Sequence, residues 1–106
     1  MIRHIILFRT KPDIGEGQIT ELFGALSNLQ SKIPGIKSFS PGAHFGSQRN
    51  QGFTHGFVMI FDSAQALKDY GPHPEHQKVK NQLLALTPGN DGDVLAFDYE
   101  IMDKNT

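Results

Sequence analysis

The chain has 106 residues, the length of one small domain with one hydrophobic core. Ten Lys and Arg against eleven Asp and Glu give a net charge of −1, which supplies no basic field for nucleic acid or an acidic membrane surface. The absence of cysteine excludes disulfides, iron–sulfur clusters and cysteine nucleophiles, so only His and carboxylates could bind a metal. We therefore expect a single domain, residues 1–106, with no nucleic acid or membrane partner.

The first strand is predicted at residues 2–9, where β-branched and aromatic residues precede a turn at Lys11-Pro12-Asp13. Both of its faces are apolar in the middle, with His4, Ile6 and Phe8 on one face and Ile5 and Leu7 on the other. The apolar stretch is too short for a signal sequence or a membrane span, and no cleavage site follows it. This favours a cytoplasmic protein.

The next segments are predicted to be a helix and an edge strand. Apolar residues at helical spacing predict an amphipathic helix over residues 18–33, and Pro34-Gly35 ends it. Residues 36–45 alternate weakly and contain Pro41-Gly42, which suits an edge strand or a bulge. A polar loop over residues 46–52 follows.

The second half of the chain begins with its strongest strand, residues 53–61, which has His55, Phe57 and Met59 on one face and is apolar on both. Ser63 is expected to cap a short helix over residues 64–70, and Gly71-Pro72 breaks it. Pro74 suits the first position of another helix, which runs to about Leu86. A last strand is predicted over residues 94–101.

The element order is β-α-β-β-α-β with a break in the second helix, which is the ferredoxin-like α+β pattern. In that topology the first and third strands are central neighbours, so His4 and His55 lie on adjacent strands. The helices of one chain cover one face of the sheet, yet both central strands are apolar on both faces. We therefore predict a homodimer in which a second copy packs on the uncovered face.

The segment from Tyr70 to His76 contains a phenol and two imidazoles, which are groups suited to acid/base chemistry near neutral pH. His76 lies on the apolar stripe of its helix, with Val79, Leu83 and Leu86, so it is expected to face the sheet. His73 is expected at the helix cap with its ring toward solvent. His73 and His76 without a carboxylate pattern are a weak metal signal, so no metal is predicted. For any single histidine, an ordinary hydrogen-bonded residue of the core is the alternative interpretation.

If the faces of the strands that carry His4 and His55 both meet the helices, these histidines line one space with Tyr70 and His76. Five apolar residues would wall it: Ile6, Phe8, Phe57, Met59 and Leu83. A mostly apolar cavity with a few polar groups is typical of small-molecule sites. The pattern therefore predicts a small hydrophobic, oxygenated ligand, although periodicity alone leaves open which strand face meets the helices.

Several stretches in the right order make the whole chain resemble the stress-responsive dimeric α/β-barrel (Dabb) family. They are Ile2-Arg3-His4-Ile5-Ile6-Leu7-Phe8, Ile33-Pro34-Gly35-Ile36, Gly52-Phe53-Thr54-His55-Gly56, Tyr70-x-x-His73-Pro74-x-His76 and Phe97-Asp98-Tyr99. The resemblance implies ferredoxin-like subunits whose sheets pair to form a barrel. One plant enzyme of the family performs an aldol condensation on a linear polyketide thioester without metal or cofactor. By similarity to it, Tyr70 and His76 would be catalytic, and His4 and His55 would orient the substrate.

Three functions are compatible with these observations. The first is a cofactor-independent enzyme of the cyclase or lyase kind, in which His76 abstracts a proton from carbon and Tyr70 hydrogen-bonds it or the developing oxyanion. The second is a non-catalytic, stress-protective homo-oligomer in which the histidines satisfy one another. The third, an oxidase of polycyclic or haem substrates, rests on shared shape alone.

Overall fold

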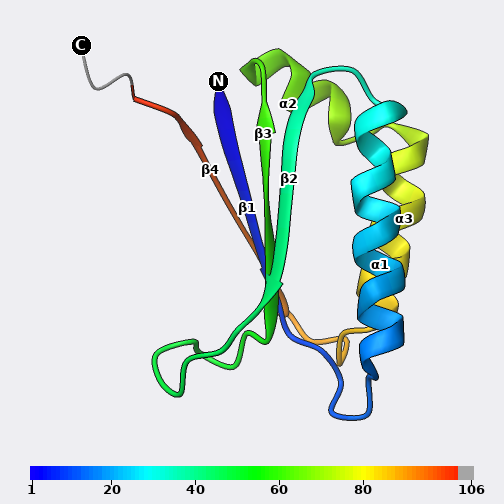
Figure 1. Ribbon diagram of the computed structural model, residues 1–106, viewed down its shortest axis with the longest axis vertical. Helices are drawn as coiled ribbons and strands as arrows, with labels where there is room; N and C mark the ends of the chain where they lie inside the picture. The colour runs from blue at the N-terminus through cyan, green and yellow to red at the C-terminus, as the bar shows by residue number, and fades with distance from the viewer. Residues whose placement is uncertain (103–106) are drawn as a thin grey trace.

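Eight elements make up the computed structural model, which describes residues 1–102. In chain order they are β1 (Ile2–Phe8), α1 (Glu16–Asn28), the 3₁₀ turn η1 (Leu29–Ser31), β2 (Ile36–Ala43), β3 (His55–Phe61), α2 (Ala64–Tyr70), α3 (Pro74–Ala85) and β4 (Val94–Glu100). The strands form one antiparallel sheet in the order β2-β3-β1-β4. This is the ferredoxin-like fold predicted from the sequence, with β1 and β3 as central neighbours. Helices α1 and α3 lie side by side on one face of the sheet (Figure 1).

Helix α1 begins earlier and ends earlier than the prediction of 18–33. The Gln18 side chain accepts a hydrogen bond from the backbone N–H of Gly15 at 3.1 Å, which fixes the start at Glu16. At the other end, the N–H of Lys32 bonds to the carbonyl of Leu29, an i to i−3 contact that tightens the last turn into η1. The buried stripe of the helix nevertheless faces the sheet as expected.

Strand β2 lies at the edge of the sheet, as Pro41-Gly42 indicated. The irregularity in its pairing, however, falls between Ile36 and Ser38, and Pro41 itself pairs in register with Phe57. Strand β2 ends at Ala43 and β3 begins at His55, so the connecting segment extends beyond the predicted 46–52 at both ends.

The break between α2 and α3 follows the prediction closely. The Ser63 hydroxyl accepts a hydrogen bond from the N–H of Ala66 at 3.1 Å and caps α2. Pro74 occupies the first turn of α3. His73 is the cap residue, but its ring is half-buried because Nδ1 accepts a hydrogen bond from the N–H of Glu75 at 3.1 Å. The expectation that His73 points into solvent was therefore wrong.

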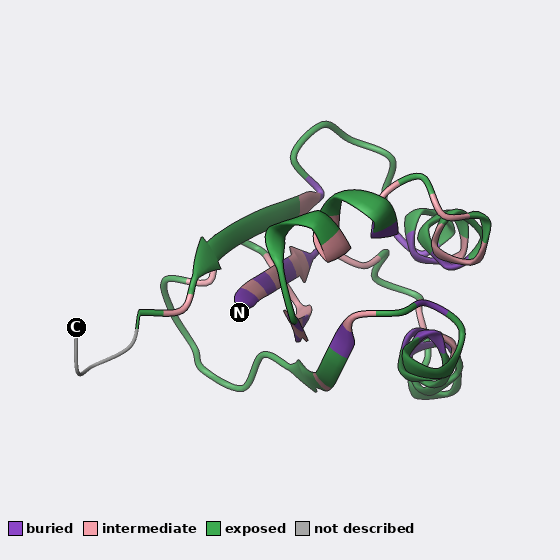
Figure 2. Cartoon of the chain, turned by 90° about the horizontal axis from the view of Figure 1, so that it is seen from above, coloured by how far each residue is buried: buried purple, intermediate pink, exposed green. Residues whose placement is uncertain are grey.

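The two faces of the sheet differ sharply in burial. Along β1, buried residues alternate with half-buried ones, and the buried set faces the helices (Figure 2). On β4 the opposite face carries three exposed apolar or aromatic residues, with Leu95 46%, Phe97 61% and Tyr99 36% accessible. A broad apolar face therefore has no cover within the described chain. None of the helices described is long and apolar enough to cross a membrane.

Candidate active site

A cavity of about 230 Å³ lies between the sheet and α3. His4 of β1, Tyr70 at the end of α2 and His76 in the first turns of α3 all line it, so the structure brings these three residues together. Its walls are mainly apolar, and they include three of the five residues predicted for them, namely Ile6, Phe57 and Leu83. The cavity thus combines apolar walls with a few polar groups, the usual composition of a small-molecule site.

The geometry of His76 fixes which of its nitrogens carries a proton. Its Nδ1 lies 2.8 Å from the carbonyl oxygen of Gly71. A carbonyl can only accept, so Nδ1 must be the donor, and in the neutral ring Nε2 keeps a free lone pair. Burial is the main cause that lowers the pKa of His76 below its ordinary value of 6.5, and the positive charge of Lys80 acts in the same direction. At neutral pH, His76 therefore has an unprotonated Nε2 that can act as a base.

Tyr70 contributes a hydroxyl without a protein partner. Its ring packs against that of His76 in a tilted arrangement with centroids 4.0 Å apart, and it meets Phe61 edge-on at 4.9 Å. No group among residues 1–102 hydrogen-bonds the hydroxyl, yet no fully buried side-chain nitrogen or oxygen in that range lacks a partner, so the oxygen has some accessible surface. Tyr70 is one of the residues that line the cavity. Burial raises the pKa of Tyr70 well above its usual value of 10.0, which keeps the group protonated. The hydroxyl is therefore a free donor at neutral pH.

A carboxylate on the neighbouring strand β4 holds the His4 ring. Asp98 is the direct partner of His4 in the pairing of β1 with β4, and the carboxylate Oδ1 bonds to Nδ1 of the imidazole. His4 is buried, whereas the Asp98 side chain is half exposed. A carboxylate accepts from Nδ1–H, so it fixes the ring orientation and leaves Nε2 as the second functional nitrogen.

His55, Phe8 and Met59 do not line this cavity, contrary to the prediction. The antiparallel register pairs Phe8 with His55 and His4 with Met59, so the two histidines lie four residues apart along the sheet, roughly 13 Å at strand spacing. His55 instead stacks on Phe8 with centroids 5.6 Å apart. Phe8 is a fully buried core residue. Parity alone does not give the position along the strand, which is why Phe8 and His55 fall outside the cavity. Met59 pairs with His4 but is also a fully buried core residue.

Sequence reasoning missed several cavity residues. Lys80 is the polar one, and the apolar ones are Leu26, Val79, Leu84, Val94 and Ala96. Asp98 does not line the cavity itself, but its contact with His4 was missed as well. The spacing of Val94, Ala96 and Asp98 puts them on one face of β4, and that signal was available. Lys80 is four residues after His76, which places it on the same helix face.

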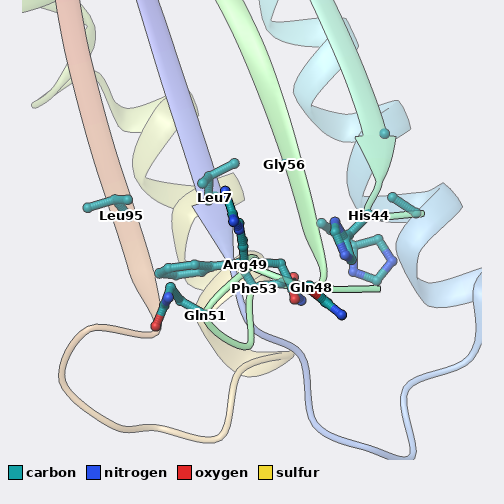
Figure 3. Close-up of a pocket in the computed structure, with 12 residues that line it drawn as sticks. Leu7, His44, Gln48, Arg49, Gln51, Phe53, Gly56 and Leu95 are labelled. Atoms are coloured by element: carbon teal, nitrogen blue, oxygen red, sulfur yellow. Dashed lines mark hydrogen bonds between the residues drawn. The ribbon is translucent and has the colours of Figure 1, made fainter. Parts of the chain in front are cut away.

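A second, larger hollow of about 490 Å³ lies at the other end of the sheet. Figure 3 shows Leu7 and Leu95 of the neighbouring strands β1 and β4 above the loop residues Arg49, Gln51 and Phe53. The hollow also includes His55, which bonds to the Thr54 hydroxyl at 2.8 Å. Within residues 1–102, no three His, Asp or Glu side chains converge in a way that could hold a metal ion. The residues that line this hollow include no tyrosine, and its His55 bonds to a hydroxyl and not to a carboxylate. In both respects the hollow differs from the helix-side cavity.

Comparisons with known proteins agree with the geometry. The model of a family described as "Stress responsive A/B Barrel Domain" (Dabb) matches residues 2–101. A stress-response A/B barrel domain-containing protein of Arabidopsis thaliana, HS1, is 30% identical over 93% of this chain and 88% of its own length. The olivetolic acid cyclase of Cannabis sativa is 34% identical over 71% of this chain and 75% of its own. Among solved structures, a dimeric ferredoxin-like protein of unknown function from Jannaschia sp. CCS1 superposes with a TM-score of 0.83 at 25% identity, covering 94% of this chain and 98% of that one.

Proposed function

Because the chain belongs to the stress-responsive A/B barrel domain family, we propose that its helix-side cavity binds a small apolar, oxygenated molecule and catalyses proton transfer on it. The reaction class is that of a cyclase or lyase that works without a cofactor, and His76 and Tyr70 are its acid/base pair. The similarity to olivetolic acid cyclase supports a ligand that carries carbonyl groups.

In the proposed mechanism, Nε2 of His76 removes a proton from a carbon next to a carbonyl. The electron pair of the broken C–H bond moves into an enolate, whose oxygen accepts a hydrogen bond from the Tyr70 hydroxyl. In a cyclisation the enolate carbon then attacks a second carbonyl of the same molecule, and the resulting alkoxide takes the proton back from His76. Nε2 of His4, whose ring Asp98 orients, would hold the ligand in place.

The hydrogen bond from His76 to Gly71 carries this proposal. It sets the tautomer that a base requires, and burial of the ring favours the neutral form at pH 7. The His76 ring is half-buried, so a nitrogen without a protein partner is open to a ligand in the cavity. Nε2 of His76 bonds to no group among the described residues, which supports a role toward a ligand.

Turnover by a His76→Gln variant tests the proposal. The wild type would be incubated with short linear polyketide thioesters, and products would be followed by mass spectrometry. We expect loss of turnover by about 100-fold or more in the variant, because general base catalysis is worth about that much. Unfolding and sedimentation should show an intact assembly. Equal turnover in the variant would remove His76 as the base.

A stress-protective role without turnover is the second candidate, and ring packing in the cavity favours it. Tyr70 packs against the tilted ring of His76 and meets His4 edge-on with centroids 6.0 Å apart, so these side chains also hold α2 and α3 to the sheet. On this alternative, His76→Ala lowers the melting temperature substantially and no compound in the panel is turned over.

We also propose that the chain forms a homodimer through its uncovered sheet face. The exposed side chains of Leu95, Phe97 and Tyr99 are the apolar surface that such contact would bury. The dimeric state of the Jannaschia protein, which shares the fold, supports this arrangement.

A further inference from the structure

We propose that Lys80, at the edge of the helix-side cavity, binds a carboxylate of the ligand, so that the ligand is a small carboxylic acid with an apolar body. This inference rests on the proposed function, because it concerns the ligand of the same cavity. It assigns the charged end of that ligand, which neither the acid/base pair nor the apolar walls define.

Lys80 differs from the other residues that line the cavity in its charge. The lining includes two histidines and no Asp or Glu, so Lys80 is its one permanent cation within the described chain. No carboxylate among residues 1–102 forms an ion pair with it. By contrast, Nζ of Lys78 on the same helix lies 3.4 Å from Oε2 of Glu75, although the Lys78 side chain is 74% exposed. Lys80 thus lines an apolar cavity and has no carboxylate partner among the described residues.

The position of Lys80 on α3 sets where the carboxylate lies. Lys80 follows His76 by four residues, and side chains at this spacing are neighbours on a helix face, with Cβ atoms about 5–6 Å apart. Lys80 is exposed and His76 is half-buried, and both residues line the cavity. A ligand whose carboxylate meets Lys80 would place a carbon a few bonds away beside Nε2 of His76.

Charge and size narrow the ligand class further. A phosphate ester carries close to two charges and three acceptor oxygens, for which one lysine is insufficient, whereas a carboxylate carries one charge. The cavity of 230 Å³ corresponds to the liquid volume of roughly eight water molecules. A compact monocarboxylate, with the bulk of one aromatic ring or a short branched chain, fits these limits.

The electrostatic environment of His76 is consistent with this assignment. The pKa of His76 is lowered by burial above all, the hydrogen bond to Gly71 raises it, and the nearby charge of Lys80 lowers it further. A carboxylate on Lys80 would cancel part of that repulsion. Ligand binding would thereby make His76 a stronger base when a substrate is present.

Binding of phenylacetate and of its uncharged isostere phenylacetamide to the full chain tests the inference. Nuclear magnetic resonance titrations would follow the ring signals of His76 and give a dissociation constant for each compound. We expect the wild type to prefer phenylacetate by about fivefold, the ratio for a partly exposed ion pair. Lys80→Met should abolish the preference and still bind phenylacetamide, whereas Lys78→Met should behave like the wild type.

The outcomes separate the two proposals. Equal affinity of the wild type for both compounds, an unchanged preference in Lys80→Met, or no binding of either compound would overturn the inference. Turnover does not enter these measurements. If His76→Gln were as active as the wild type while the phenylacetate preference persisted, the acid/base mechanism would fail and the role of Lys80 would stand.

Discussion

Tyr70→Phe removes one hydroxyl and leaves an aromatic ring in place, which makes it a sharp test of the cavity. The ring keeps its contacts with His76 at 4.0 Å and with Phe61 at 4.9 Å. Since no group of residues 1–102 bonds to the hydroxyl, its loss leaves no donor or acceptor unpaired. We therefore expect the free energy of unfolding to change by less than about 0.5 kcal/mol.

A matched Tyr70→Ala variant gives the scale for that comparison. Tyr70 is only 3% exposed, so deletion of its ring should destabilise the fold by about 3–5 kcal/mol. Urea unfolding followed by circular dichroism, at one fixed protein concentration, measures both variants against the wild type. If the hydroxyl stabilises a developing oxyanion, Tyr70→Phe should also reduce turnover by about 100- to 1,000-fold.

Two results would refute the reasoning. Destabilisation of Tyr70→Phe by more than about 1.5 kcal/mol would mean that the hydroxyl is bonded within the protein, since that is the penalty for leaving a buried partner unpaired. Turnover equal to that of the wild type would exclude the hydroxyl as the donor to the oxyanion, even if stability were unchanged.

The remaining predictions concern pH, ring orientation and assembly. Burial lowers the pKa of His76 and of His55, so the unfolded chain binds protons before the folded chain does as pH falls past 6.5. Stability should be full above that pH and decline as pH falls toward the lowered pKa values of the folded state. The decline should be smaller in His76→Gln, as melting curves would show. If the melting temperature of His76→Gln fell with pH as steeply as that of the wild type, this prediction would be contradicted. Asp98→Ala should free the His4 ring and reduce kcat about 10- to 100-fold, with a change in the ¹⁵N shifts of His4 that a purely structural loss would not produce. Phe97→Glu should convert the dimer into monomers in light scattering, and an unchanged mass would exclude the uncovered face as the interface.

Most of the fold could be predicted from the sequence because turn residues and apolar spacing mark it strongly. Gly71-Pro72 follows the end of α2 as predicted, whereas α1 ends at Asn28 and the 3₁₀ turn η1 continues only to Ser31, ahead of Pro34-Gly35. The face of β1 that meets the helices follows from the topology together with the alternation of its residues. Edge placement of β2 follows from Pro41, which cannot donate to a neighbouring strand.

The candidate site was less predictable because it depends on register. Parity places His4 and His55 on the same side of adjacent strands, but a shift of four residues along the sheet separates them. The partnership of His4 with Asp98 joins residues 94 positions apart, and no local pattern encodes that pairing. His76 was placed correctly because helical spacing within α3 is a local property.

Asp98 lies on the face of β4 that carries the contact with His4, whereas its neighbours Phe97 and Tyr99 lie on the opposite, uncovered face. In the described chain β4 pairs with β1 alone, so a single ladder secures the carboxylate that orients His4. A second copy seated on Phe97 and Tyr99 would hold the same strand from behind. Dilution would then loosen the carboxylate before it unfolds the protein, and specific activity would fall with protein concentration while the far-ultraviolet spectrum stayed unchanged.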